Sequence, residues 1–199
     1  MPLSVRTRRL ILPLAVFVVG LVALVVAAVV TLVPGGSGIA PSGVGGPFSL
    51  VNQDGKRVTE RDFAGAPHLV FFGFTHCPDI CPTTLQQITD VLQALGPKGR
   101  DVRALFIAVD AERDTPAALK TYLASFDPRI VGLTGSADEI AAAVKGYRAY
   151  VRKVPGKGAD YTMEHTAIVY IMDARNRFIN ALNLMRPPEQ SAAELAKVL

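Results

Sequence analysis

Residues 47–199 are predicted to fold as a three-layer α/β domain. A continuous apolar run at 69–74, and a second run at 102–109 that is apolar except for Arg103, have the length and composition of buried strands. Apolar residues at helical spacing follow each run, at 85–95 and 115–126. Strands that alternate with helices in this way predict a sheet with helices packed on both of its faces.

Turn and capping residues mark the boundaries of the first elements. Residues 48–51 and the turn Asp54-Gly55 predict a short leading hairpin. The helix after the first buried strand is expected to end at Gly96-Pro97. The next helix is expected to begin at Thr115-Pro116, which supplies an N-cap and a proline in the first turn.

The last third of the domain combines two helices with further strands. Capping boxes, in which a glutamate follows a serine by three residues, predict the two helices (Ser136 with Glu139, and Ser191 with Glu194). A short strand is expected to begin at Val151, and a pair of strands is expected at 167–172 and 178–184. This order of elements matches a thioredoxin-like sheet, which we take as the expected fold.

A single transmembrane helix is predicted ahead of the domain. Residues 10–33 contain no charged side chain, and a helix of that length spans roughly 36 Å, enough for a hydrocarbon core of about 30 Å. Residues 1–9 hold three arginines, and no basic residue follows the apolar run until Lys56. The positive-inside rule therefore predicts a cytoplasmic N-terminus, a single pass through the inner (cytoplasmic) membrane and a periplasmic C-terminal domain.

A cleaved signal peptide is the alternative interpretation of this segment. The apolar core of a signal peptide normally spans about 7–15 residues, which is shorter than this run, although Gly38-Ile39-Ala40 offers a cleavage site. No cysteine lies near the end of the run, so a lipoprotein signal is excluded. Residues 34–46 consist mainly of Gly, Ser and Pro and predict a flexible linker between the anchor and the domain.

The charge distribution excludes a nucleic-acid-binding protein. The net charge of +4 comes from 21 Lys+Arg and 17 Asp+Glu, and removing the three arginines of residues 1–9 leaves 18 basic against 17 acidic side chains. A surface that binds phosphates needs a cluster of basic residues, and none is visible in the domain. The two cysteines are also too few for a disulfide scaffold.

The two cysteines are the first candidate functional residues. Cys77 and Cys81 directly follow the first buried strand, at the sheet edge where α/β proteins bind ligands. Pro78 and Pro82 both suit a first helical position, so at least one sulfur is expected near a positive helix end, which favours the thiolate. Residues four apart on a helical turn have Cβ atoms about 5–6 Å apart, whereas a disulfide prefers roughly 3.5–4.5 Å. The spacing favours a metal held by two thiolates and leaves a reversible disulfide open.

A third metal ligand is expected among the three histidines. His68 is interpreted as a solvated residue flanking the strand, and His76 is expected to point away from Cys77 in the extended segment. His165 lies in the loop that packs against the cysteine turn of a thioredoxin-like sheet. That loop normally carries a cis-proline, and residues 157–185 contain no proline. His165 is therefore the expected ligand, and a buried histidine bonded to the backbone is the alternative.

Two thiolates and a neutral imidazole form a soft ligand set of low coordination number. Such a set suits Cu(I), and the imidazole also accommodates Cu(II), whereas a structural zinc site would need a fourth ligand. Met163 and Asp79 are further candidates, although core packing and turn formation are the preferred interpretations. Asp110 and Asp114, after the second strand, are interpreted as loop or capping residues rather than as residues that dock a partner.

Four segments, in this order, resemble the Sco/SenC copper-chaperone family: FFGFTHCPDICPTTL, AVDAERDTP, FDPRIVGLTG and DYTMEHTAIVYIMD. The resemblance covers about residues 47–199. It departs from the family at Ala111, where proline is common, which affects loop stiffness rather than ligation. The resemblance implies a thioredoxin-like fold that binds one copper through Cys77, Cys81 and His165, and a role in building the binuclear copper centre of cytochrome c oxidase.

We therefore expect a membrane-anchored copper chaperone rather than an enzyme. Its expected partners are the copper-bearing subunit of cytochrome c oxidase and an upstream copper donor or thiol reductant. A redox-active disulfide between Cys77 and Cys81 would abolish copper binding, so the thiol redox state would control loading. The alternative is a thiol–disulfide oxidoreductase that reduces the target's cysteines before metallation, against which the CxxxC spacing and the missing cis-proline argue. A peroxidase of thioredoxin fold is a weaker interpretation.

Overall fold

The computed structural model describes residues 19–22, 24, 43–158 and 160–199. The chain divides into two compact units, residues 1–40 and 41–199. In the first unit, the described residues are helical and exposed. Among all residues that the structure describes, no helix is both long and apolar enough to cross a membrane. Most of the predicted anchor and linker lies outside the described residues.

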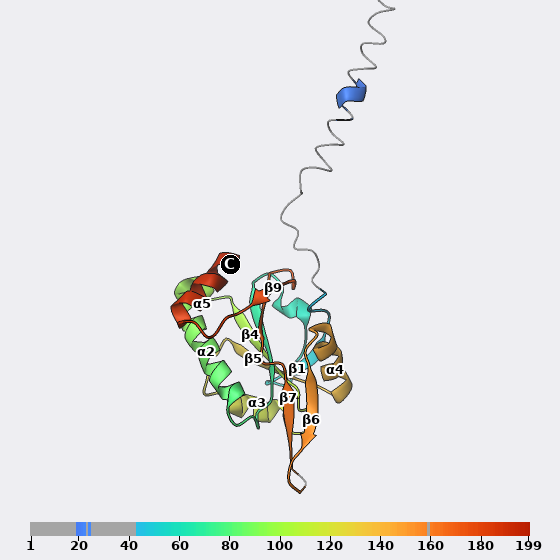
Figure 1. The fold of residues 1–199 in the computed structure, drawn as a ribbon, viewed down its shortest axis with the longest axis vertical. Helices are drawn as coiled ribbons and strands as arrows, with labels where there is room; N and C mark the ends of the chain where they lie inside the picture. Colours follow the sequence, from blue (N-terminus) through green and yellow to red (C-terminus); the bar gives the residue numbers. More distant parts are fainter. Residues whose placement is uncertain (1–18, 23, 25–42, 159) are drawn as a thin grey trace, which may run out of the picture. The chain divides into compact units, whose positions relative to one another are not determined.

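The second unit is built on a mixed sheet of seven strands (Figure 1). The strand order is β2-β1-β5-β4-β3-β8-β9. The central strands β3, β4 and β5 run parallel, whereas β1, β2, β8 and β9 pair with their neighbours in antiparallel fashion. The strands are β1 (Ser49–Asn52), β2 (Arg57–Thr59), β3 (His68–Gly73), β4 (Arg103–Ala108), β5 (Ile130–Thr134), β8 (Val169–Met172) and β9 (Phe178–Ala181).

Helices cover both faces of this sheet, which confirms the predicted three-layer α/β, thioredoxin-like architecture. Figure 1 shows α2 and α5 together on one side of the sheet and α4 on the other. The helix α3 packs against β5, where Gly132 leaves room for Leu119 and Leu123. The α-helices are α2 (Ile80–Leu95), α3 (Pro116–Leu123), α4 (Ala137–Gly146) and α5 (Pro188–Leu195), and the short 3₁₀ turns are η1 (Glu60–Phe63), η2 (Gly96–Gly99) and η3 (Ala196–Val198).

The hydrophobic core lies on both faces of β3 and β4. Every residue of β3 is buried, and only the first residue of β4 is partly exposed. Phe71, Phe72 and Phe106 are among the largest fully buried side chains. The prediction that the two apolar runs are central strands is confirmed, because only strands covered on both faces bury all their side chains.

The position of His68 contradicts its interpretation as a solvated flank. His68 is the first residue of β3 and is only 2% exposed. It pairs with Arg103 on one neighbouring strand and with Met172 on the other, and its ring contacts Phe63 at a centroid distance of 6.3 Å. The strand therefore begins one residue earlier than predicted, and burial lowers the pKa of His68 below its ordinary value.

Helix boundaries agree with the predicted caps in two cases and disagree in a third. Thr115 caps α3, and the capping box of Ser136 with Glu139 opens α4. The capping box predicted at Ser191 is wrong, because α5 begins earlier, at Pro188. Ser191 is buried within this helix, where its hydroxyl donates a hydrogen bond to the carbonyl oxygen of Asn183 at 2.7 Å.

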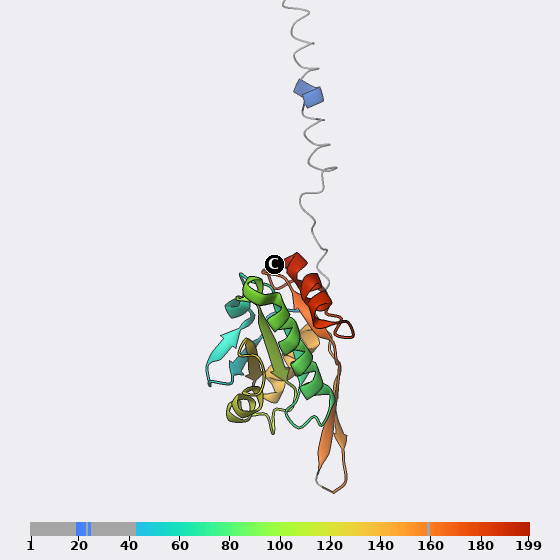
Figure 2. The same cartoon turned by 90° about the vertical axis from the view of Figure 1, so that its left-hand side faces the viewer.

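A two-stranded hairpin stands apart from the main sheet. It consists of β6 (Val151–Pro155) and β7 (Tyr161–His165), which pair with each other. Figures 1 and 2 both show this hairpin extending away from the rest of the unit. A strand at Val151 was predicted, whereas residues 161–165 were expected to be a loop. The strand follows from their alternation, since Tyr161, Met163 and His165 are partly buried and the residues between them are exposed.

Candidate metal centre

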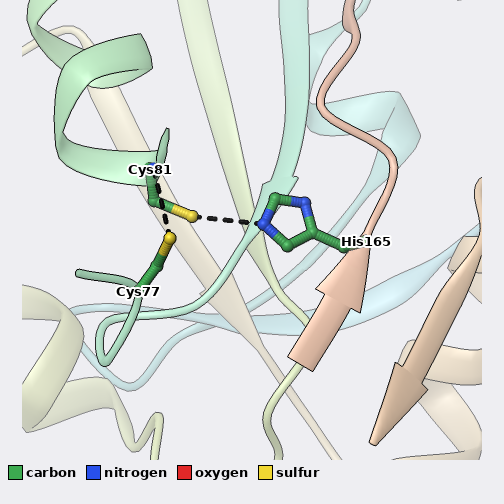
Figure 3. A group of neighbouring side chains, drawn as sticks. All are labelled: Cys77, Cys81 and His165. Atoms are coloured by element: carbon green, nitrogen blue, oxygen red, sulfur yellow. Dashed lines mark hydrogen bonds between the residues drawn. The ribbon is translucent and has the colours of Figure 1, made fainter. Parts of the chain in front are cut away.

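The structure brings Cys77, Cys81 and His165 together (Figure 3). One ligand atom from each, the two sulfurs and a ring nitrogen, all lie within 4.8 Å of one another. The Nε2 atom of His165 lies 3.4 Å from Cys81 Sγ. The three residues come from the β3–α2 loop, the first turn of α2 and the end of β7.

The first turn of α2 directs a backbone N–H at the sulfur of Cys77. The helix begins at Ile80 with Asp79 as its N-cap, and not at Pro78 or Pro82 as predicted. Cys77 therefore precedes the helix, and its sulfur accepts a hydrogen bond from the backbone N–H of Cys81 at 3.3 Å. Such a first-turn N–H has no partner within the helix and favours an anion. The prediction that one sulfur lies near a positive helix end is confirmed.

The two sulfurs differ in environment. Cys81 is fully buried, whereas Cys77 is half-buried, and both are free thiols. Burial raises the pKa of the Cys81 thiol far above its ordinary value, so this sulfur keeps its proton at neutral pH. A metal that binds both sulfurs must therefore displace the proton of Cys81.

The imidazole of His165 is oriented by one backbone contact and two aromatic rings. Its ring lies edge-on to Phe71 and Phe74, at centroid distances of 6.0 and 5.9 Å. Its Nδ1 atom lies 3.2 Å from the carbonyl oxygen of Thr166. Because a carbonyl can only accept, Nδ1 carries the proton and the lone pair of Nε2 faces the sulfurs. Burial lowers the pKa of His165, which keeps the ring neutral.

The two interpretations of His165, a metal ligand and a buried histidine bonded to the backbone, are compatible. It is partly buried and bonded to the backbone, and the backbone contact directs Nε2 towards Cys81. Metal-binding histidines are commonly oriented in this way, by a hydrogen bond from the second ring nitrogen.

The site is open to solvent on one side. A cavity of about 260 Å³ opens above it and is lined by Cys77, Ile80, Met163 and His165, among other residues. Ile80 is 50% exposed at the rim. An open position of this kind lets a ligand from another molecule reach a bound metal.

The other candidate residues lie outside the cluster. His76 is exposed, and its Nδ1 lies 3.0 Å from the hydroxyl of Thr75. Asp79 serves at the start of α2, where its carboxylate accepts a hydrogen bond from Thr83 at 3.5 Å. Met163 lines the opening of the site.

Asp114, which was interpreted as a loop or capping residue, holds the turn that carries Cys77. It is fully buried, and its carboxylate accepts hydrogen bonds from the backbone N–H of Thr75 at 3.1 Å and from the Thr75 hydroxyl at 2.6 Å. Thr75 begins the turn that carries Cys77. This contact could have been expected from the order of the strands. Because β3 and β4 are parallel neighbours, the loops that follow them meet at one edge of the sheet.

Comparison with known proteins gives one consistent result. The family model described as SCO1/SenC matches residues 37–199. SenC of Rhodobacter capsulatus is 38% identical over 178 residues, which cover 84% of this chain and 80% of the relative. The chain spans only 43% of the length of a mitochondrial SCO1 homologue from Arabidopsis thaliana.

Solved structures show the same relationship. ScoI of Bradyrhizobium japonicum with copper bound is 53% identical, with a TM-score of 0.76 over 78% of this chain and 99% of that one. BsSco, described as a member of the Sco family of cytochrome c oxidase assembly proteins with a disulfide switch, is 28% identical, with a TM-score of 0.63 over 79% of this chain and 95% of that one. With a family model that matches most of its length, the chain belongs to the SCO1/SenC family.

Proposed function

We propose that this protein binds one copper ion through Cys77 Sγ, Cys81 Sγ and His165 Nε2 and delivers it during assembly of cytochrome c oxidase. The observation that carries the proposal is the grouping of two sulfurs and an imidazole nitrogen within 4.8 Å of one another. Two thiolates suit Cu(I), and the imidazole also accommodates Cu(II). The copper-bound ScoI structure, which is 53% identical to this chain, supports the choice of metal.

The unequal environments of the sulfurs give loading an order. Cys77 is the more accessible sulfur, so it meets incoming copper first. Cys81 then loses its proton and His165 Nε2 completes the set, since its lone pair already faces the sulfurs. Three ligands leave the open side for a sulfur or imidazole of the acceptor, which exchanges with them one at a time.

Oxidation of the two thiols would prevent loading. The sulfurs of Cys77 and Cys81 lie within 4.8 Å of each other as free thiols, whereas a disulfide needs about 2.05 Å. Forming the disulfide requires the two sulfurs to approach each other, and the oxidised pair offers no thiolates. Copper loading therefore requires the reduced form, which a thiol reductant would maintain.

The cellular setting is part of the proposal. The apolar run of residues 10–33 anchors the protein in the inner membrane and exposes the domain on the periplasmic side. The partners are the copper-bearing subunit of cytochrome c oxidase and an upstream copper donor or thiol reductant. The protein acts by stoichiometric transfer and not by catalytic turnover.

A transfer assay tests delivery. Reduced full-length protein in detergent is loaded with one Cu(I) and mixed with the copper-free copper-bearing domain of the oxidase, and copper in each is measured after separation. We expect stoichiometric transfer from the wild type and less copper held and transferred by the His165→Ala or Cys77→Ser variant loaded under the same conditions. Absence of transfer, combined with turnover of a model disulfide that needs Cys77 but not His165, would contradict delivery and support an oxidoreductase.

A further inference from the structure

The hairpin that carries His165 has few contacts that fix its angle to the sheet. Within the described residues, β7 pairs only with β6, and neither strand is hydrogen-bonded to the seven-stranded sheet. The backbone N–H of Thr166 donates to the carbonyl oxygen of Tyr150, and the N–H of Tyr150 donates to the Thr166 hydroxyl, so these bonds join the two sides of the hairpin to each other. At its His165 end, the hairpin meets the sheet through ring contacts of His165 with Phe71 and Phe74, which are not hydrogen bonds.

Packing under the hairpin is also incomplete. A cavity of about 580 Å³ lies between the hairpin residues Val151 and Met163 and the helix residues Ile140 and Val144. Val151 and Met163 contact the edge of the hydrophobic core, but a hollow of this size leaves part of the hairpin's inner face unpacked. The orientation of β7 must therefore depend on specific contacts elsewhere.

Those contacts come from the loop between β4 and α3. Asp110 in this loop is only 3% exposed and accepts hydrogen bonds from Arg113 Nε and from the Tyr161 hydroxyl, the latter at 2.8 Å. Arg113 Nη1 also donates to the carbonyl oxygen of Tyr161 at 3.3 Å. Burial opposes ionisation of Asp110, but the hydrogen bonds outweigh it and the pKa of Asp110 is lowered, so the carboxylate is charged.

The aromatic ring of Tyr161 is also held in place, by two cations. The guanidinium carbon of Arg113 and the ammonium nitrogen of Lys153 each lie 3.8 Å from the ring centroid. Lys153 in turn donates a hydrogen bond to Glu112, in the same loop, at 2.6 Å. Two cations on one ring, both tied to the same loop, leave Tyr161 little freedom to move.

Tyr161 and His165 lie at opposite ends of the same strand and on the same face. Four residues of strand separate their Cα atoms by about 13 Å. A strand paired to its neighbour behaves as a rod, so holding Tyr161 sets the tilt and register of the end that carries His165. The same loop holds the cysteine turn, since Asp114 binds Thr75. The loop between β4 and α3 therefore contacts both the strand that carries His165 and the turn that carries Cys77.

We infer that Asp110, Arg113 and Tyr161 are positioning residues, which place His165 Nε2 against the two sulfurs. The inference rests on the proposed copper site, because it assigns these residues a role in the geometry of that site. They do not touch the metal. Their effect is exerted through the strand β7.

The test measures nitrogen ligation rather than stability alone. Full-length Tyr161→Ala, Tyr161→Phe and Arg113→Gln variants are loaded with Cu(II), and the nitrogen couplings are measured by pulsed electron paramagnetic resonance. We expect Tyr161→Ala and Arg113→Gln to weaken or lose the imidazole coupling and to bind Cu(I) about tenfold more weakly. Tyr161→Phe keeps the ring between its cations and should lie between Tyr161→Ala and the wild type.

Arg152→Ala is the matched control. Arg152 lies on the same hairpin, but its ion pair with Glu164 is exposed and does not reach the loop. We expect this variant to keep the wild-type copper signature. A second control combines Tyr161→Phe with His165→Ala, and in that background the tyrosine change should have no further effect on copper.

The outcomes separate this inference from the proposed function. If His165→Ala itself leaves the nitrogen coupling unchanged, the ligand set is wrong and both proposals fail. If His165→Ala removes the coupling while folded Tyr161→Phe and Arg113→Gln proteins keep it at full strength and bind Cu(I) as the wild type does, the positioning role is overturned and the copper site stands.

Discussion

Cys81 Sγ occupies the space in which a side chain at position 73 would stand. A β-carbon on Gly73 would lie 2.8 Å from this sulfur and 2.6 Å from Cε2 of Phe106. Both distances are well inside van der Waals contact, so only glycine lets the buried sulfur pack against the end of β3. The last residue of this strand therefore helps to determine where Cys81, and any metal it holds, can lie.

Gly73→Ala should therefore displace Cys81 and weaken copper binding. Overpacking of this kind costs about 1–3 kcal/mol of stability. Gly132→Ala is the matched control. Gly132 lies on β5, away from the sulfurs, and its β-carbon would lie 2.6 Å from Cδ1 of Leu123. We expect both variants to unfold at lower denaturant concentration, and only Gly73→Ala to lose affinity for Cu(I) in a competition titration. Equal affinity in the two variants would contradict this account.

Asp114→Ala should loosen the turn that carries Cys77. It leaves the N–H and hydroxyl of Thr75 without their acceptor, which costs about 1–3 kcal/mol when the groups remain buried. Asp127→Ala removes another buried carboxylate, one that binds Arg129 elsewhere in the fold. We expect comparable losses of stability in urea, with faster release of Cu(I) to a chelator only in Asp114→Ala. Identical release rates would show that Asp114 does not act on the site.

His68 should make the protein less stable in mild acid. Above pH 6.5, its ordinary pKa, the imidazole is neutral in the folded and the unfolded chain. Below that pH the unfolded chain takes up a proton that the buried ring resists, because burial lowers the folded pKa. The free energy of unfolding then falls, by at most about 1.4 kcal/mol per pH unit for one group.

Urea unfolding of the wild type and of His68→Gln between pH 5 and pH 8 measures this contribution. The difference between the two unfolding free energies should be constant above pH 6.5 and should shift in favour of His68→Gln below it. A difference that stays constant down to pH 5 would mean that the folded chain accommodates the charged ring.

Copper should stabilise the reduced protein and not the oxidised one. A ligand that binds only the folded state at 100 times its Kd raises the free energy of unfolding by about 2.7 kcal/mol. We expect thermal unfolding to shift upward on addition of Cu(I) to the reduced protein, and to return when a chelator removes the metal. After oxidation of Cys77 and Cys81 the shift should vanish. A shift of equal size in both redox states would place the metal elsewhere.

The parts of the fold that could be predicted are those whose signal is local. The strands β3 and β4 are covered on both faces and so appear as apolar runs after a polar first residue, and the caps of α3 and α4 depend on residues within one turn. The burial of His68 could not be read in this way, because it depends on β8, about 100 residues further along the chain. Similarly, Ser191 resembles a cap but serves inside the helix.

The same distinction between local signals and long-range contacts applies to the candidate site. The pair of cysteines after a buried strand, and a histidine before a later strand, were visible in the sequence, and the structure brings them together. The supporting contacts were not visible. Asp110 with Tyr161 and Asp114 with Thr75 join segments 51 and 39 residues apart, so these contacts depend on the folded chain and not on any local pattern.

X-ray absorption at the copper edge of the reduced, Cu(I)-loaded full-length protein tests the central claim most directly. We expect two sulfur neighbours and one imidazole nitrogen in the wild type. His165→Ala should keep both sulfurs and lose the imidazole scattering, and either cysteine-to-alanine change should remove one sulfur. Wild-type copper with no imidazole in its first shell, or an unchanged spectrum in His165→Ala, would contradict the assignment.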